Sequence, residues 1–226
     1  IGVVFGGRIG SVLFYGFQQD SQRYFSDPMA WLAVWDGGMS FHGGFLGVLL
    51  AVVIWSRFNP KTRFWEVTDL LAISAPIGLF FGRIANFING ELYGRPTDVP
   101  WAMRFPTFGP NGVKDQWTEP RHPSQLYESF LEGLVLLIVL NVMWRNPAIR
   151  DRAGIVTGGF MAGYGFFRFL VEFVRKPDNG IEAGFFKFAG LGTFTTGQEL
   201  SFPMIIAGVA LMLWRRNQTP AGTPAP

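Results

Sequence analysis

The sequence of 226 residues contains no cysteine and only two histidines, His42 and His122. Without cysteine the chain has no disulfide framework, no thiolate metal site and no thiol nucleophile, and two histidines are too few for a convincing zinc site. We therefore expect neither a metal nor a cofactor. A pI near 9.4 is compatible with a nucleic-acid partner, but no basic run with interleaved aromatic residues occurs, so we expect no nucleic-acid binding.

Charged residues are also scarce, at 15%, whereas 49% of the residues are hydrophobic. This composition and several long apolar runs are typical of a multi-span membrane protein rather than of one or two soluble domains. A mean hydropathy of +0.23 indicates that sizeable polar loops separate the spans. We predict an all-α, polytopic membrane helix bundle over residues 1–217 and a disordered tail over residues 218–226.

Six apolar segments are candidate spans, although several fall short of the ~20 residues that cross a bilayer. They are Ile1–Phe17, Ser40–Trp55, Val67–Ile88, Leu126–Trp144, Gly154–Phe173 and Leu200–Trp214. Basic residues recur in every second connection and after the last span: Arg57, Lys61 and Arg63, then Arg145, Arg150 and Arg152, then Arg215 and Arg216. By the positive-inside rule, this alternation puts the C-terminus in the cytoplasm and makes Asn89–Gln125 an external head loop.

Glycine occurs 29 times, often at four-residue spacing within the predicted spans. Such pairs let two helix backbones approach closely in lipid. We expect this structural role for Gly2/Gly6/Gly10, Gly43/Gly47, Gly78/Gly82, Gly154/Gly158 and Gly159/Gly163.

Along Phe81–Arg95 (F-G-R-I-A-N-F-I-N-G-E-L-Y-G-R), polar residues begin while the apolar run of the third predicted span still continues, so some of them should lie at membrane depth. Arg83 and Asn86 share a helix face, and Glu91 follows just past the span. Arg83 is either an interfacial arginine that reaches the outer surface or part of a functional site, which is the default hypothesis for an ionisable group at membrane depth. Two further arginines near this depth, Arg95 and Arg8, favour an anionic ligand, because guanidinium binds phosphate bidentately.

His42 lies near the outer end of the second predicted span. It is either hydrogen-bonded to a neighbouring helix or a proton acceptor, because imidazole titrates near neutral pH. Arg168 and Glu172, four residues apart among phenylalanines, are either a structural ion pair within the membrane or part of a site. Arg175 lies on the same helix face, so this group keeps a net positive charge.

The segment His122–Glu128 (H-P-S-Q-L-Y-E) opens the fourth span at its outer end. Pro123 and Ser124 suit a helix entry. That explanation does not account for three polar residues so close to the apolar run, Gln125, Tyr127 and Glu128. Together with the residues above, they indicate an enzyme or a binding protein that acts on an anionic lipid headgroup in the outer leaflet.

Six motifs, in order along nearly the whole chain, resemble the prolipoprotein diacylglyceryl transferase family. They are G-G-R-I-G (Gly6–Gly10), M-S-F-H-G-G (Met39–Gly44), G-R-I-A-N-F-I-N-G-E-L-Y-G-R (Gly82–Arg95), R-H-P-S-Q-L-Y-E (Arg121–Glu128), R-F-L-V-E-F (Arg168–Phe173) and G-Q-E-L-S (Gly197–Ser201). The resemblance implies a multi-pass enzyme of the bacterial inner membrane with its active site near the outer leaflet. It would transfer the diacylglyceryl group of phosphatidylglycerol to the lipobox cysteine of prolipoproteins and release glycerol 1-phosphate.

The same resemblance implies seven spans. Because the chain starts at Ile1 within an apolar pattern, we expect that the family's first helix, which carries a functional tyrosine, is missing from this sequence. The absence of cysteine fits a scheme in which the protein substrate brings the only thiol. The implied partners are phosphatidylglycerol, membrane lipid and the prolipoprotein signal peptide, and we expect a monomer.

By motif match, the family's essential positions fall on His42, Arg83, Asn86, Glu91, Gly94, Arg168 and Glu172. We expect Arg83 and Arg168 to stabilise the charge on the departing phosphate. A free thiol has a pKa near 8.5, so a base is needed, and His42 is the candidate, with Glu91 or Glu172 orienting groups or helping proton transfer.

For substrate binding we expect contributions from Asn86, Gly94, Arg95, Arg8, Gln125 and Tyr127, besides Arg83. The main alternative is a transporter or flippase for an anionic lipid, which would use the same arginines for binding without chemistry. Inverted repeats with broken helices would favour that alternative.

Overall fold

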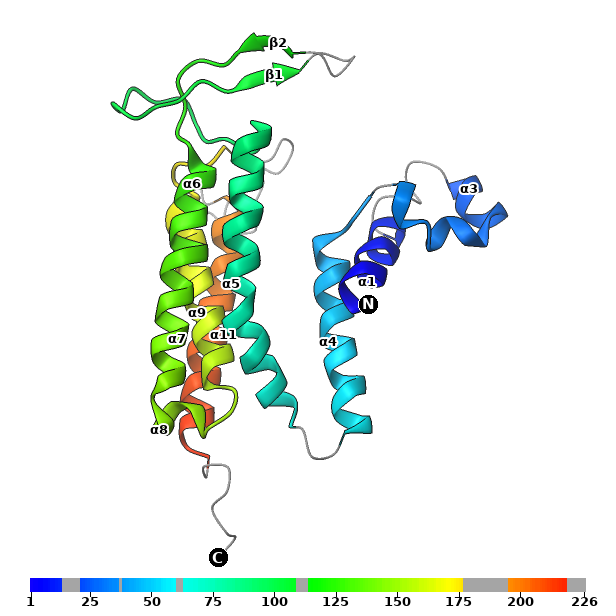
Figure 1. Cartoon of the computed structure of the whole chain (residues 1–226), viewed down its shortest axis with the longest axis vertical. Coiled ribbons are helices and arrows are strands. Elements are labelled where there is room, and N and C mark those ends of the chain that lie inside the picture. Colours follow the sequence, from blue (N-terminus) through cyan, green and yellow to red (C-terminus); the bar gives the residue numbers. More distant parts are fainter. Residues whose placement is uncertain (14–20, 37, 60–62, 109–113, 177–194, 219–226) are drawn as a thin grey trace, which may run out of the picture. The chain divides into compact units, whose positions relative to one another are not determined.

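The structure is a computed structural model that describes residues 1–13, 21–36, 38–59, 63–108, 114–176 and 195–218. The chain divides into two compact units, Ile1–Val67 and Thr68–Pro226. Both are built mainly from helices (Figure 1). The predicted tail falls almost wholly outside the described residues, as does most of the connection that precedes the last predicted span.

The first unit is organised around two closely packed helices, α1 (Gly2–Ser11) and α4 (Phe41–Phe58). A Cβ atom added at Gly2 would lie 2.5 Å from the carbonyl oxygen of Gly47, and one added at Gly10 would lie 2.5 Å from the Cα atom of Gly43. Only glycine permits this approach, so the predicted role is confirmed for the glycines of α1 and α4. The same prediction is wrong within the second unit for Gly78 and Gly82, where an added Cβ atom would meet nothing within 4 Å. In the sequence, α1 and α4 are separated by α3 (Ser21–Ser26) and by the 3-10 helices η2 (Pro28–Trp31) and η3 (Val34–Asp36).

The second unit is a bundle of long helices (Figure 1). Its members are α5 (Phe64–Asn89, which begins in the first unit), α6 (Ser124–Glu128), the π-helical segment η4 (Ser129–Val135), α7 (Leu136–Arg145), α8 (Pro147–Arg150), α9 (Ile155–Val171) and α11 (Thr196–Arg216). The segments α6, η4 and α7 follow one another without a break, so residues 124–145 form one long helical rod. Buried Ala72, Leu136, Leu140 and Val156 form the core of the bundle.

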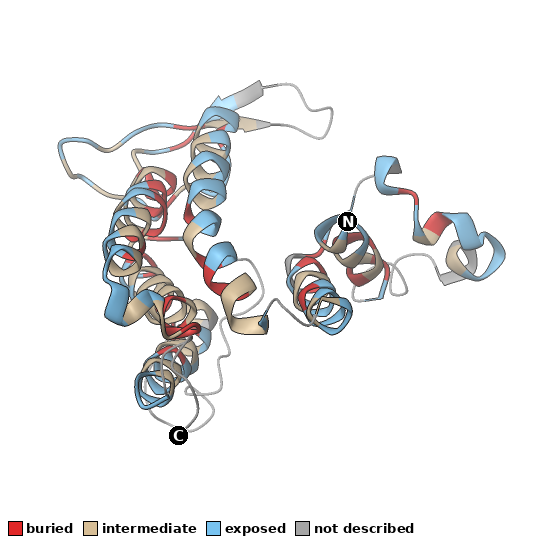
Figure 2. Cartoon of the chain, turned by 60° about the horizontal axis from the view of Figure 1, so that its bottom comes forward, coloured by how far each residue is buried: buried red, intermediate tan, exposed pale blue. Residues whose placement is uncertain are grey.

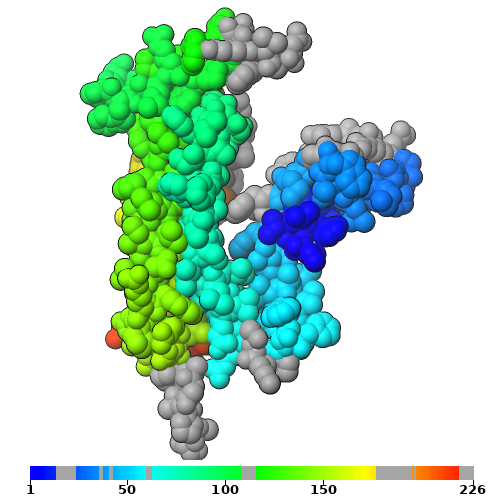
Figure 3. All heavy atoms as spheres, viewed as in Figure 1, coloured from blue at the N-terminus to red at the C-terminus, as the bar shows by residue number. Residues whose placement is uncertain are grey.

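The outward faces of these helices are apolar. In Figure 2 the exposed residues line the outside of each helix, and in Figure 3 α5 and α7 form a continuous face of the second unit. Large side chains on these faces include Phe81, at 62% exposed, and Val142, at 60%. Water does not favour such a surface, whereas the acyl chains of a bilayer do.

Three helices are long and apolar enough to cross a membrane: Phe64–Asn89, Ser124–Arg145 and Gly197–Arg216. They coincide with the third, fourth and sixth predicted spans, which confirms a largely helical membrane protein. The apolar helices Gly43–Phe58 and Ile155–Val171 are shorter, and the first predicted span runs into residues outside the described part. The count of six spans therefore stays a prediction.

The segment between α5 and α6 carries a two-stranded antiparallel sheet, β1 (Pro106–Phe108) and β2 (Lys114–Trp117), which pairs Pro106 with Trp117. This hairpin lies at one end of the helix bundle (Figure 1). The segment matches the predicted head loop in position along the chain, and its location outside the membrane stays a prediction.

A buried carboxylate fixes the start of α9. Asp69 of α5 is 0% exposed, and its two oxygens accept hydrogen bonds from the backbone N–H groups of Gly154 and Thr157, each at 2.7 Å. The first N–H groups of a helix have no acceptor within the helix, and here Asp69 of the neighbouring helix α5 is their acceptor. This contact sets the position of α9 along α5, and with it the level at which Arg168 lies.

Candidate active site

The polar stretch that ends α5 is held in a tight turn. The Gly90 N–H donates to the Phe87 carbonyl at 3.1 Å, and the Glu91 N–H donates to the Asn86 carbonyl at 3.0 Å. This pair of bonds is a Schellman motif, which needs a left-handed residue just after the helix, and Gly90 supplies it with φ +70°. The turn folds Glu91 back so that its Oε1 accepts hydrogen bonds from the Asn86 amide at 2.8 Å and the Asn89 amide at 3.3 Å.

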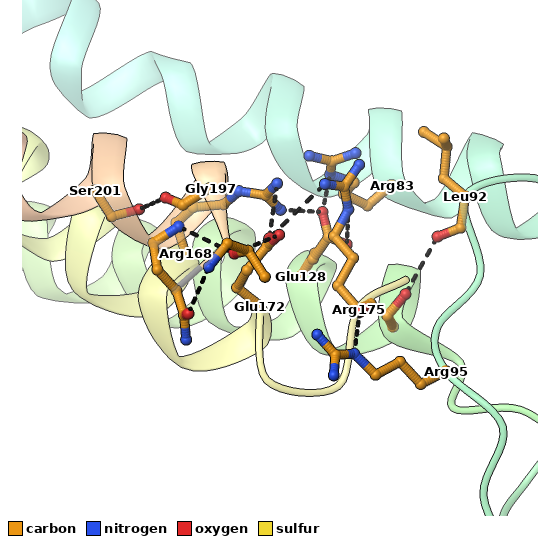
Figure 4. A network of polar contacts seen from close by, with 12 residues as sticks. Arg83, Leu92, Arg95, Glu128, Arg168, Glu172, Arg175, Gly197 and Ser201 are labelled. Atoms are coloured by element: carbon orange, nitrogen blue, oxygen red, sulfur yellow. Dashed lines mark hydrogen bonds and ion pairs between the residues drawn. The ribbon is translucent and has the colours of Figure 1, made fainter. Parts of the chain in front are cut away.

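Three arginines converge on one buried carboxylate, that of Glu128 at the end of α6 (Figure 4). Arg83 Nε of α5 lies 2.8 Å from Glu128 Oε2, and Arg168 Nη1 of α9 lies 3.5 Å from the same oxygen. Arg175 Nε, just past α9, lies 3.8 Å from Oε1. Glu128 is 0% exposed, so these ion pairs are shielded from water and the carboxylate fixes where the three guanidinium groups meet.

Glu172 adds a second carboxylate to this group. Its Oε2 lies 3.1 Å from Arg168 Nη2 and 3.8 Å from Arg175 Nη1, and its Oε1 accepts a hydrogen bond from the Thr195 hydroxyl at 3.0 Å. A Cβ atom at Gly197 would lie 2.6 Å from the Glu172 carboxyl carbon, so α11 closes tightly over it. The structure contains the ion pair that one of the two alternatives for Arg168 and Glu172 proposed, and the role of these residues in function stays a prediction.

We call Arg83, Arg168, Arg175, Glu128 and Glu172 the arginine cluster. With all five side chains ionised it carries one net positive charge. Arg83 reaches Glu128 through Nε, and among the described residues its two terminal nitrogens have no hydrogen-bond partner. The Arg83 side chain is 20% exposed, more than that of the other two arginines. An uncommitted, partly exposed edge of a guanidinium group is suited to binding an oxyanion.

The segment between α5 and α6, called the head segment from here on, is bonded to the end of α9 through the backbone around Gly94. The Gly94 N–H donates to the His122 carbonyl at 2.9 Å, and the Arg95 N–H donates to the Val174 carbonyl at 2.9 Å. A Cβ atom at Gly94 would lie 2.5 Å from the Val174 oxygen, so only glycine fits. Arg95 Nε donates to the backbone carbonyl of Arg175 at 2.8 Å. Gly94 and Arg95 therefore position Arg175 through its backbone.

Gln125 links the two polar regions. It is 0% exposed, and its Nε2 donates to the Glu91 carbonyl at 2.6 Å, while the neighbouring Ser124 hydroxyl donates to the Leu92 carbonyl at 3.2 Å. Leu92 has φ +55°, a left-handed conformation that is costly for a residue with a Cβ atom. The start of α6 thus holds a strained turn at the end of α5.

Tyr127 lies in a different group of side chains. Its hydroxyl accepts a hydrogen bond from Trp101 Nε1 at 2.6 Å and lies 3.3 Å from His122 Nδ1. Among the described residues, no arginine contacts Tyr127. The substrate-binding role predicted for Tyr127 stays a prediction.

Two predicted site residues belong to the first unit. Arg8 is 3% exposed, and its Nη2 donates to the Ala30 carbonyl at 2.7 Å. His42 is the second residue of α4, which begins after Ser40, whose hydroxyl accepts a hydrogen bond from the Gly43 N–H at 3.3 Å. The His42 side chain lies outside the described part of the structure. The roles predicted for both residues stay predictions.

Two members of the arginine cluster, Glu128 and Arg175, were absent from the predicted site residues. Their sequence signals were present, since Glu128 ends the His122–Glu128 motif and Arg175 shares a face with Arg168. Glu132, which is not a member of the arginine cluster, also gave a sequence signal, since it lies four residues after Glu128 within an apolar run. This signal was overlooked. Among the described residues no group of three or more His, Cys, Asp or Glu side chains is arranged to hold a metal ion.

Comparisons with known proteins give consistent matches. A family model described as prolipoprotein diacylglyceryl transferase matches residues 1–214. The chain is 50% identical over 224 residues to a phosphatidylglycerol--prolipoprotein diacylglyceryl transferase of Photobacterium profundum, covering 97% of this chain and 74% of that protein. It is 52% identical over 214 residues to a protein of the same name from Vibrio vulnificus (95% and 71%), and 51% identical over 224 residues to one from Azospirillum brasilense (98% and 76%).

Proposed function

The chain belongs to the prolipoprotein diacylglyceryl transferase family, and we propose that the arginine cluster is where it holds the phosphate of phosphatidylglycerol during catalysis. The chain is a transferase that moves the diacylglyceryl group of phosphatidylglycerol to prolipoproteins. The observation that carries the proposed site is the convergence of Arg83, Arg168 and Arg175 on the buried Glu128 carboxylate, with the terminal nitrogens of Arg83 uncommitted.

The chemistry is displacement at a carbon atom. The cysteine thiolate of the prolipoprotein attacks the glyceryl carbon, a C–S bond forms, and the C–O bond to phosphate breaks. The electron pair leaves on the phosphate oxygen, so glycerol 1-phosphate departs with one more negative charge than the phosphodiester had. Preorganised cations in a site with little water stabilise that charge, and the arginine cluster offers one net positive charge at a single place.

Each residue of the site has a part in this scheme. Arg83 and Arg168 bind the phosphate, and Arg175 completes the positive field. Glu172 holds Arg168 at 3.1 Å, while Gly94 and Arg95 position Arg175. Four residues of the second unit shape or line the headgroup pocket in this proposal: Asn86, Glu91, Gln125 and Tyr127. Arg8 of the first unit contributes to substrate binding. His42 takes the proton of the thiol.

The membrane arrangement completes the proposal. The enzyme is a multi-pass protein of the bacterial inner membrane with six spans in this sequence, a transmembrane transferase domain over residues 1–217 and a monomeric state. The arginine cluster and the head segment face the outer leaflet, and the C-terminus is cytoplasmic. The basic connections of the sequence support this orientation. The alternative of a transporter or flippase for an anionic lipid has no support in the comparisons.

The test is transfer by the purified protein in bilayer nanodiscs. The protein is incubated with phosphatidylglycerol and a lipobox peptide, and mass spectrometry follows the thioether product and free glycerol phosphate. We expect both products in equal amounts, none with phosphatidylethanolamine, and none with a peptide that has serine in place of the cysteine. Lipid binding without a thioether product would contradict the proposal. Retention of full activity by Arg83→Ala would exclude the arginine cluster as the phosphate site.

A further inference from the structure

A third glutamate lies beside the arginine cluster without belonging to it. Glu132, on the π-helical segment η4, is 0% exposed. Neither of its carboxyl oxygens has a hydrogen-bond partner among the described residues, and no arginine nitrogen of that part of the chain lies within ion-pair distance of it. It follows Glu128 by four residues on the same rod, yet of these two glutamates only Glu128 forms ion pairs with the arginines.

The residues next to Glu132 along the rod are closely packed. The next residue, Gly133, meets α5 so closely that a Cβ atom there would lie 2.7 Å from the Cα atom of Phe80. The Ser129 hydroxyl donates to the Phe80 carbonyl at 3.1 Å, and Leu136, four residues after Glu132, belongs to the core of the bundle. Glu132 is therefore buried within the helix bundle, about one turn farther along the rod than Glu128.

An ionised carboxylate in this place would be a buried charge without a contact partner. Such a charge costs many times more than a buried neutral group, and the group avoids this cost by holding a proton. The charged and titratable groups that face Glu132 are Arg83 of α5, Glu128 of α6, Tyr164 and Arg168 of α9, and Arg175. The three arginines are already engaged by Glu128, which as an anion opposes a second negative charge nearby.

We propose that Glu132 is a positioning residue that carries a proton when the lipid binds and thereby sets the net charge of the arginine cluster. The inference rests on the proposed function of that cluster. With Glu132 neutral, the cluster and Glu132 together keep one positive charge, which matches the single negative charge of a phosphodiester headgroup. With Glu132 ionised the same group is neutral, and the attraction for a monoanionic lipid is lost.

The sign of the pH dependence follows from this charge count. Below the pH at which Glu132 ionises, phosphatidylglycerol binds in full strength, and above it binding weakens. Bound lipid in turn favours the protonated carboxyl, because coupling between two binding events is reciprocal. A neutral side chain of the same shape at position 132 removes this dependence and keeps the strong binding.

The first experiment detects the proton directly. Infrared difference spectroscopy of the protein in nanodiscs reports the carbonyl stretch of a protonated carboxyl group, which carboxylates do not show. We expect this band in the wild-type protein, its loss in Glu132→Gln, and its presence in the control Glu119→Gln, whose carboxylate is 58% exposed and pairs with Arg121. A spectrum of Glu132→Gln identical to that of the wild type overturns the proposal. This readout does not depend on transferase activity, so its failure is distinct from failure of the proposed function.

The second experiment measures KM for phosphatidylglycerol in nanodiscs as the pH is raised. We expect KM of the wild type to rise by about tenfold at alkaline pH, the effect of one unit charge near the site. Glu132→Gln should keep the low KM throughout, with kcat close to that of the wild type. If Gln prevents folding, Glu132→Met, also neutral, replaces it. An unchanged KM profile in the variant, or a lost kcat with KM intact, overturns the proposal.

Discussion

Replacement of Glu128 by Gln tests whether one carboxylate holds the arginine cluster together. The substitution conserves the size of the side chain and removes its negative charge. Arg168 and Arg175 then keep their contacts to Glu172, whereas Arg83 loses its carboxylate partner among the described residues. The Gln amide also presents a donor where one guanidinium group now finds an acceptor. Among the five charged groups, the net charge rises from one positive to two.

The magnitude follows from burial and from the ion-pair distances. Removal of one partner from a buried ion pair costs about 3–5 kcal/mol, because the remaining charge stays buried without compensation. Glu128 is 0% exposed, but the Arg83 side chain is 20% exposed and that of Arg168 is 14% exposed. Water therefore screens part of the remaining charge, and we expect the lower end of the range, a loss of about 3 kcal/mol in the free energy of unfolding.

A matched control exists in the head segment. Glu119 pairs with Arg121 at 2.8 Å, the same distance as between Glu128 and Arg83, but Glu119 is 58% exposed. We expect Glu119→Gln to cost about 0–1 kcal/mol. Equilibrium unfolding of both variants in mixed micelles gives the free energies, and thioether formation gives the activity, which Glu128→Gln should lower about 10²-fold or more through misplaced arginines. Equal destabilisation by the two variants, or an active Glu128→Gln enzyme, would refute the reasoning.

Three further substitutions test other contacts. Asp69→Ala removes the acceptors for two N–H groups at the start of α9, one buried and one partly buried, and should cost about 2–3 kcal/mol of unfolding free energy. Loss of the exposed cap of α8 in Asn146→Ala should cost about 1 kcal/mol or less. Gly133→Ala should destabilise by about 1–3 kcal/mol through its clash with α5, but Gly82→Ala, open within its own unit, should be neutral or stabilise by about 0.5 kcal/mol in the same unfolding assay. Arg168→Lys keeps the charge but loses the planar fork, so kcat for thioether formation should fall by about 10²-fold, and an unchanged kcat would contradict its assigned role.

The long helices were predictable because their signal is simple. An uninterrupted apolar run of membrane length allows few other structures, and the predicted spans Val67–Ile88 and Leu126–Trp144 differ from the observed helices by only a few residues at each end. The hairpin of β1 and β2 was not predicted, because strands of three and four residues give no usable alternation of polar and apolar residues. The π-helical segment was also missed, since a changed hydrogen-bond pattern leaves the apolar run unaltered.

The site was predictable only where its partners are close in sequence. Arg168 and Glu172 are four residues apart, so one turn of helix brings them together, and their ion pair was one of the two alternatives that the sequence offered. Asn86 and Glu91 also lie near each other, on either side of the turn at Gly90. Glu128 has no arginine in its own helix, and its partners come from α5, α9 and the segment after α9. Tertiary packing brings them together, and no local spacing indicates it.

The buried carboxylate changes the meaning of arginines at membrane depth. In the sequence, several arginines near one depth indicated an anionic ligand, but a charge cannot stay buried in an unliganded protein without compensation. Glu128 supplies that compensation through Nε of Arg83, which leaves the outer edge of the same guanidinium group for the substrate. In the proposed site a phosphate would bind without displacing Glu128, because the two anions would use different nitrogens of Arg83. Two glutamates of the protein itself therefore neutralise two of the three arginines, and in the proposed site the lipid phosphate would neutralise the remaining positive charge.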